Sequence, residues 1–179
     1  PIKVNAPRPG NGFRLKGAKA FVVDGHVADV LIVAARTAGG DSDAKGITLF
    51  LVDPKTKGIA IERTIMVDAH NAARITFNDA EVTSDSVLGE IDQGGEVLDG
   101  VLNIGRGAVA SEMLGVADEA FTRTAQYLKE RKQFGKLIGE FQALQHRISH
   151  VYVDLEITRA AVLKALQTLD EDFDNAAPI

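Results

Sequence analysis

The chain has 179 residues, 45% of them hydrophobic, and a formal net charge of -5 at neutral pH. That length allows one substantial hydrophobic core or two small ones, and the scattered basic residues in an acidic chain argue against a nucleic-acid partner. The absence of cysteine excludes disulfides, thiolate metal sites and a cysteine nucleophile.

No apolar run reaches the roughly 18 residues that a membrane helix requires, so we expect no membrane span. We expect a cytoplasmic location, or the mitochondrial matrix if the protein is eukaryotic. The chain begins at Pro1 and stops shortly after a long helical pattern. It is therefore expected to be part of a longer protein.

The first half has the texture of a β domain. Runs rich in Val, Ile, Phe and Thr are separated by Gly, Asp, Asn and Pro, which is typical of strands and turns. The expected strands are Phe13–Lys16, Lys19–Asp24, Asp29–Arg36, Ile47–Asp53, Ile59–Thr64, Ala72–Phe77 and a short one near Val87. The glycine-rich segment 39–46 predicts a hairpin loop. Because no helical period interrupts the strands, residues 1–88 are expected to form an antiparallel β-sandwich or open barrel.

The period changes after residue 88. Apolar residues follow the start signal Asp92-Gln93-Gly94-Gly95 at helical spacing: Val97, Val101, Ala108, Met113, Val116, Ala120 and Tyr127. Glycines at 105, 107 and 115 would weaken an isolated helix, which favours close approach by another helix or a ligand. A second helix is predicted from Glu140 to about Leu169, with an apolar stripe that needs partner helices.

These patterns together predict an α+β fold with two domains. The antiparallel β domain covers residues 1–88, and long antiparallel helices of an incomplete helical bundle cover residues 89–179. The boundary is expected at Leu88–Gln93, where alternation gives way to helical spacing.

The segment Arg131-Lys132-Gln133-Phe134-Gly135-Lys136 lies between the two predicted helices. Glu140-Phe141-Gln142 follows at the start of the second helix. An arginine, an aromatic ring and a helix N-terminus can together bind an anion that carries a ring system. The alternative is an ordinary polar loop between helices.

Arg106 is flanked by Gly105 and Gly107 inside an apolar helical pattern. The third glycine of a dinucleotide fingerprint is missing and no strand precedes the motif, so that interpretation is rejected. Arg106 is expected either to reach solvent or to meet a carboxylate or a ligand.

No metal site is expected. His146 and His150 have the spacing of a zinc-protease helix, but Arg147 stands where that motif needs glutamate. Asp41 and Asp43 imitate the start of a calcium loop, but Lys45 occupies a ligand position.

Several segments resemble the acyl-CoA dehydrogenase family in the right order. The most specific is Glu-Arg-Lys-Gln-Phe-Gly-Lys at 130–136, followed by Ile-Gly-Glu-Phe-Gln-Ala-Leu-Gln at 138–145. Segments 107–117, 15–25, 28–29 and 49–53 fit the family's preceding helix and its middle domain. The chain thus resembles a fragment comprising the middle β-domain and the first helices of the C-terminal domain.

The resemblance implies an FAD-dependent enzyme that desaturates acyl-CoA thioesters between Cα and Cβ and passes electrons to an electron-transfer flavoprotein. It also implies a homodimer or homotetramer formed through the helical domain. Two alternatives keep the fold: an acyl-CoA oxidase or flavin monooxygenase, and a non-catalytic partner subunit.

Family positions carried over to this chain give two groups of site residues. The resemblance implies that Phe21, Val22 and Val23 bind the cofactor beside the isoalloxazine ring. It implies that Arg131 contacts the FAD pyrophosphate, usually of a neighbouring subunit. Gln133 and Phe134 would line the same site, and Gln142 would contact the adenosine side. Substrate binding falls to Asn103 and Arg106, in the stretch that contacts acyl-CoA.

Three positions depart from the family pattern. Phe21 replaces the usual tryptophan, and Val23 lacks the hydroxyl of the threonine often found there. Gly105 stands where some branches place the catalytic glutamate. The base is therefore expected beyond Ile179, no catalytic residue is expected within this chain, and the chain alone is expected to be inactive.

Overall fold

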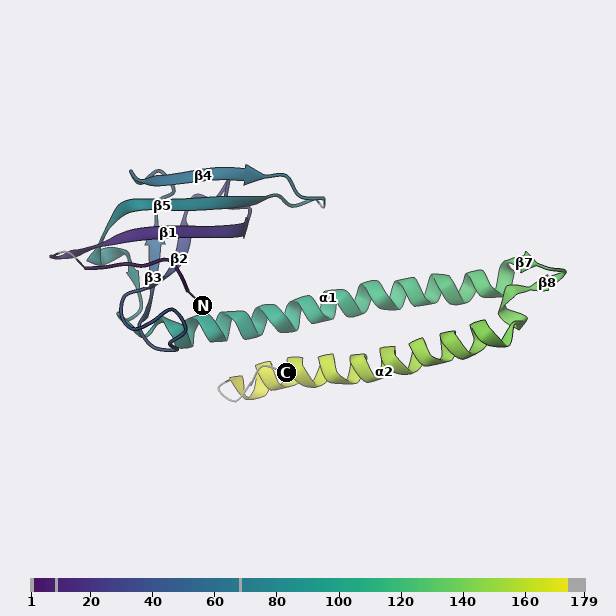
Figure 1. Ribbon diagram of the computed structural model, residues 1–179. Helices are drawn as coiled ribbons and strands as arrows, with labels where there is room; N and C mark the ends of the chain where they lie inside the picture. Colours follow the sequence, from purple (N-terminus) through teal and green to yellow (C-terminus); the bar gives the residue numbers. More distant parts are fainter. Residues whose placement is uncertain (1, 9, 68, 174–179) are drawn as a thin grey trace. The chain divides into compact units, whose positions relative to one another are not determined.

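The computed structural model describes residues 2–8, 10–67 and 69–173. The chain divides into two compact units, Pro1–Asp99 and Gly100–Ile179. The first unit holds the sheets and the first turn of a long helix, and the second is a helical hairpin (Figure 1). The predicted fold class, antiparallel sheets followed by two long helices, is confirmed.

The first unit is a sandwich of two three-stranded antiparallel sheets. One sheet has the order β1-β5-β4, formed by Gly12–Val23, Ala72–Thr83 and Ile59–Thr64. The other has the order β2-β3-β6, formed by Leu31–Arg36, Ile47–Val52 and Val87–Leu88. A short 3-10 turn, η1 (Ser84–Ser86), connects β5 to β6.

The core lies between the sheets because alternate side chains of β1, β2 and β5 point inward. Phe13 of β1 meets Phe50 of β3 edge to face, with ring centroids 5.0 Å apart. The other large side chains with almost no exposure are Leu15, Phe77, Val4 and Val52.

Two strands expected as separate, Phe13–Lys16 and Lys19–Asp24, form the single strand β1. The irregularity that the sequence shows there is absorbed by register shifts against β5 rather than by a turn. Residues 4–6 were not expected to pair, yet Asn5 bridges both Lys16 of β1 and Arg36 of β2. Val4 and Ala6 are fully buried beside it.

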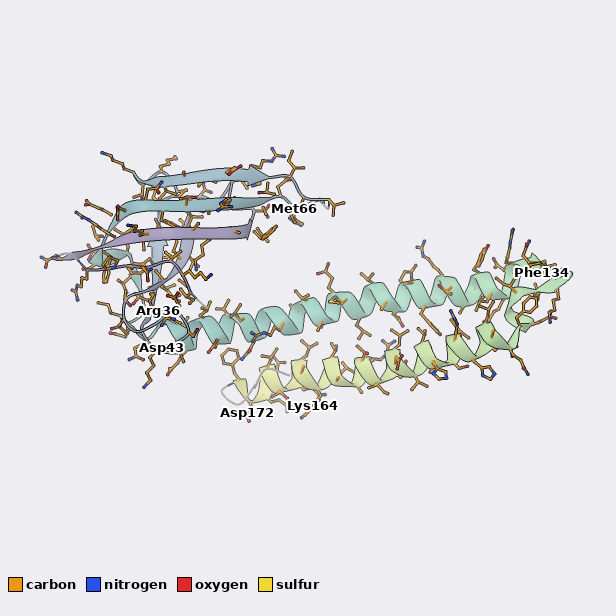
Figure 2. The ribbon with its side chains drawn as sticks, viewed as in Figure 1. Arg36, Asp43, Met66, Phe134, Lys164 and Asp172 are labelled. Carbon is orange, nitrogen blue, oxygen red and sulfur yellow. The ribbon has the colours of Figure 1, made fainter. Side chains whose placement is uncertain are left out.

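The glycine-rich segment 39–46 is the loop of the β2–β3 hairpin, as predicted. Arg36, only 5% exposed, holds this loop by donating to the carbonyls of Lys45 at 2.6 Å and Asp43 at 2.9 Å. Figure 2 labels Arg36 and Asp43 in this region. The loop keeps a defined shape because a buried guanidinium satisfies its carbonyl groups.

The second unit is an antiparallel helical hairpin. Helix α1 (Gly94–Glu130) enters it from the first unit, and α2 (Gln142–Glu171) returns along α1. The hairpin β7 (Lys132–Gln133) and β8 (Lys136–Leu137) and the turn η2 (Ile138–Glu140) connect them. No helix in the described part of the chain is long and apolar enough to span a membrane.

Small and apolar residues form the seam between the helices. Phe121 and Tyr152 lie with ring centroids 5.9 Å apart, and Arg159 bonds Asp118 across the seam at 2.8 Å. A Cβ added at Gly107 would lie 2.7 Å from Leu169 Cδ1. The expected close approach of a helix therefore holds at Gly107.

At Gly105 and Gly115 a Cβ would meet no described atom within 4 Å outside the neighbouring backbone of α1, so α2 does not approach them closely, and the expected approach of a ligand stays a prediction. The stripe predicted on α1 is largely uncovered by the described chain, since Met113 and Val116 are about two-thirds exposed. The α2 stripe does face α1 and includes the buried Leu155 and Val162. Helix α1 has apolar residues on two sides, and it contacts α2 through a different side from the predicted stripe.

Candidate functional site

The tip of the helical hairpin carries the strongest candidate site. Helix α1 ends where the Arg131 N–H donates to the Tyr127 carbonyl at 2.9 Å, and the Ile138 N–H donates to the Arg131 carbonyl at 2.8 Å. These bonds close a short β-hairpin whose two-residue turn is Phe134-Gly135. Figure 2 shows Phe134 at this end of the second unit.

The tip presents positive charge and free donors. Arg131 is exposed, and its guanidinium bonds to no residue that the structure describes. The Lys136 ammonium lies 4.2 Å from the centre of the Phe141 ring, a cation–π contact. Phe141 caps α2 with no side-chain hydrogen bond, although its carbonyl accepts from the Leu144 and Gln145 N–H groups, so the N–H groups of Gln142 and Ala143 have no side-chain cap from Phe141. This arrangement can bind an anion.

The remaining cofactor candidates of the second unit lie in the same region. Phe134 is 92% exposed, and its ring centroid is 6.3 Å from that of Phe141 in an edge-on arrangement. Gln133 donates from Nε2 to the Lys132 carbonyl at 2.8 Å. Gln142 is the exposed first residue of α2. The structure therefore brings Arg131, Gln133, Phe134 and Gln142 into one segment.

Asn103 and Arg106 form a second candidate site on α1. Arg106 Nη1 donates to Asn103 Oδ1 at 2.7 Å, so the guanidinium is held along the helix one turn away. About 36 Å of helix separates Arg106 from the end of α1 at Glu130. The structure does not bring the Arg106 site and the hairpin tip of one chain together.

The third candidate site is the end of β1 in the first unit. Phe21 and Val23 are 71% and 69% exposed, while Val22 packs against the core. Lys19 lies two positions before Phe21, and burial lowers the pKa of its ammonium group. Lys19 bonds to none of the described side chains. This end of the strand offers an apolar surface with an aromatic ring.

Two features of these sites were not singled out from the sequence. The Lys136–Phe141 contact could have been inferred from a basic and an aromatic residue flanking one turn. The Asp118–Arg159 pair could not, because 41 positions separate the partners. Hydrogen bonding and charge from Asp118 raise the pKa of Arg159. Within the described residues, no group of three or more His, Cys, Asp or Glu side chains could hold a metal ion.

Known protein families match both units. Residues 2–80 match the family described as acyl-CoA dehydrogenase, middle domain, and residues 92–179 match the family described as acyl-CoA dehydrogenase, C-terminal domain. These matches cover most of the chain.

Three relatives illustrate the similarity. The chain is 34% identical over 172 residues to the mitochondrial short/branched chain specific acyl-CoA dehydrogenase of Bos taurus, covering 94% of this chain and 40% of that protein. It is 28% identical to butyryl-CoA dehydrogenase from Megasphaera elsdenii, with a TM-score of 0.80 over 93% of this chain and 44% of that one. The structure titled "PigA with FAD and proline" gives 27% identity and a TM-score of 0.87 over 95% and 45%. The chain thus spans less than half the length of these relatives.

Proposed function

The chain belongs to the acyl-CoA dehydrogenase family, and we propose on that premise that it is part of a flavoenzyme that oxidises acyl-CoA thioesters between Cα and Cβ. The observation that carries the proposal is the hairpin tip, where residues 131–142 supply an arginine with no bonding partner among the described residues, an exposed aromatic ring and a helix N-terminus without a side-chain cap. A dinucleotide supplies the matching groups, namely a pyrophosphate and planar rings.

The residues present fit FAD. Arg131 would pair with the pyrophosphate, since guanidinium matches phosphate oxygens bidentately. Phe134 and Gln133 would line the same site, and Gln142 would contact the adenosine side. Phe21, Val22 and Val23 would lie beside the isoalloxazine ring, with backbone N–H groups and ring packing in place of a threonine hydroxyl. When bound, FAD accepts the hydride from Cβ.

Asn103 and Arg106 would contact acyl-CoA. Their hydrogen bond holds the guanidinium in place before any ligand arrives, which lowers the entropy cost of binding. Gly105 beside them carries no side chain and leaves space on this face of α1. We assign no residue of this chain to removal of the α-proton and propose that the base lies in another part of the protein.

Separation along α1 supports an oligomer. Because about 36 Å of helix lies between Arg106 and the hairpin tip, we assign the two sites of one chain to different cofactor sites. A homodimer or homotetramer formed through the helices would let the hairpin of one copy reach the flavin of another. We also propose a domain boundary at Leu88–Gln93, after which α1 begins at Gly94.

The proposed electron acceptor is an electron-transfer flavoprotein. The relative in Bos taurus is named as mitochondrial, and we propose the mitochondrial matrix for this protein if it is eukaryotic and the cytoplasm otherwise. Neither assignment rests on the site geometry.

Anaerobic addition of acyl-CoA thioesters to the full-length protein tests the reaction. We expect a member of the thioester series to bleach the visible absorption of the flavin, with slow recovery in air and fast recovery with an electron-transfer flavoprotein. Rapid recovery in air with formation of hydrogen peroxide would instead identify an oxidase. Unchanged absorption with every thioester would contradict the proposal.

A non-catalytic partner subunit is the second candidate. Phe21 and Val23 favour it, because both depart from the residues usual at the flavin in the family. A full-length protein that binds acyl-CoA but lacks flavin would support this second function.

A further inference from the structure

Five non-glycine residues in the described part of the chain have a left-handed backbone with positive φ. Three are aspartates, Asp24, Asp79 and Asp92, whose short polar side chains tolerate this conformation. The other two are Phe21 at 54° and Phe134 at 53°. A phenylalanine gains no local hydrogen bond there and suffers the full steric conflict.

Phe21 occupies one of two opposed irregularities in the β1–β5 ladder. On β5 two residues, Asn78 and Asp79, lie opposite the single residue Lys16 between the Leu15–Ala80 and Gly17–Phe77 pairs, and the left-handed residue is Asp79. On β1 two residues, Ala20 and Phe21, lie opposite the single residue Arg74 between the Lys19–Ile75 and Val22–Ala73 pairs. The two bulges are equivalent, but only the one on β1 places an aromatic residue in the strained position.

The bulge on β1 changes which face its side chains occupy. Lys19 and Val22 are partly buried, although strict alternation would place them on opposite faces. Phe21 consequently points outward with 71% of its surface exposed. The strained backbone of Phe21 thus occurs together with an exposed Phe21 ring.

Phe134 repeats the combination in the second unit. It is the first residue of a two-residue hairpin turn in which Phe134 and Gly135 have φ of 53° and 81°. Turns with two positive φ values favour Asn-Gly or Asp-Gly. Phenylalanine instead holds this position, with 92% of its surface exposed and only an edge-on contact to Phe141.

We propose that Phe21 and Phe134 are held in strained backbone conformations in order to present their rings to a planar heteroaromatic ligand. Local strain persists where it serves a site, and neither ring contributes to a core that would explain it. This inference rests on the proposed function, in which the ligand is FAD with a planar ring system at each end. It goes further by predicting that both residues trade stability for ring contact.

The stability of the full-length protein without added FAD tests the strain. Phe21→Asn and Phe134→Asn remove the ring and suit positive φ, whereas Phe21→Leu and Phe134→Leu remove the ring and keep the strain. We expect each Asn variant to melt about 2–4 °C above its Leu counterpart. The control Ile32→Asn, at a 67% exposed position in β2 with ordinary φ, is expected to lower the melting temperature. Equal melting of the Asn and Leu variants would overturn the inference.

FAD titration of the same variants tests the ring contact. The Asn and Leu variants of Phe21 and Phe134 are each expected to bind FAD about tenfold more weakly than wild type. The ring-preserving variants Phe21→Tyr and Phe134→Tyr and the control Ile32→Asn are expected to bind FAD like wild type. Wild-type binding in both Leu variants would overturn this inference and leave the proposed function intact. A wild-type protein that takes up no FAD would overturn the proposed function and, with it, the ligand assigned here.

Discussion

Arg131 lies at the junction of α1 and the β7–β8 hairpin, exposed and without a bonding partner among the described residues. Its replacement by alanine should leave the fold intact and weaken FAD retention. Loss of one charge-assisted contact costs on the order of 1.5–3 kcal/mol, or about 10- to 100-fold in affinity. Flavin content after dialysis measures the effect.

Arg123→Ala is the matched control for Arg131→Ala. Arg123 is an exposed arginine of α1, eight positions before Arg131, and pairs with Glu119 four positions away. Its loss should leave flavin content unchanged. Flavin content of Arg131→Ala equal to that of wild type would remove the assigned role of Arg131.

Lys19 gives a pH-dependent prediction. Burial lowers its pKa in the folded state, so the folded protein disfavours the charged ammonium. The penalty is present at neutral pH and is lost as pH rises from the lowered pKa to the ordinary value of 10.5. Lys19→Met should therefore raise stability at neutral pH, and its advantage should shrink as pH approaches 10.5. Melting temperatures of both proteins across this range would show it, and a constant difference would refute it.

The sequence identified the residues of the hairpin tip but not their conformation. Arg131, Gln133, Phe134 and Gln142 were found because they lie close together in one motif. The left-handed backbone of Phe21 and Phe134 has no sequence signal, because phenylalanine is a poor choice for positive φ. Residue type alone predicts an ordinary strand at Phe21 and does not reveal the bulge.

At the scale of elements, two glycines of α1 differ in their surroundings: Gly107 packs against α2, whereas Gly115 has open space around it. Gly115→Ala should stabilise the protein by about 0.5–1 kcal/mol, because its Cβ would meet no described atom within 4 Å. Gly107→Ala should gain less, since Leu169 must shift, and Gly107→Leu should cost about 1–3 kcal/mol by overpacking the seam. Denaturant unfolding measures the series. Equal effects of alanine at both positions would contradict the helix packing described here.

The periodicity of the sequence predicted which segments form strands and helices. It did not predict that two strands merge into β1 or which face of α1 packs on α2. The β2–β3 hairpin and both helices were predicted because spacing in the sequence sets alternation and helical period. The merging of two expected strands into β1 was missed, because bulges break the alternation that marks a strand. The apolar residues of α1 were found by their spacing, but the face of α1 that packs on α2 was not, since hydrophobicity alone does not rank two apolar faces.

At the scale of the molecule, α1 leaves an apolar face uncovered. Val109, Met113 and Val116 follow one another at spacings of four and three residues, Tyr127 lies further along α1, and each is more than half exposed. We expect the purified chain to self-associate through this face. Sedimentation should show weaker association for Met113→Glu than for Val153→Glu on α2. A monodisperse wild-type monomer would refute the prediction.

At the scale of the whole protein, we infer that this chain belongs to a flavoprotein whose cofactor contacts the hairpin tip and the end of β1. The visible absorption spectrum of the full-length protein, recorded as purified and again after incubation with FAD and removal of the excess, tests it most directly. We expect bound flavin in an equimolar ratio to the chain. A colourless protein that retains no FAD after this treatment would contradict it.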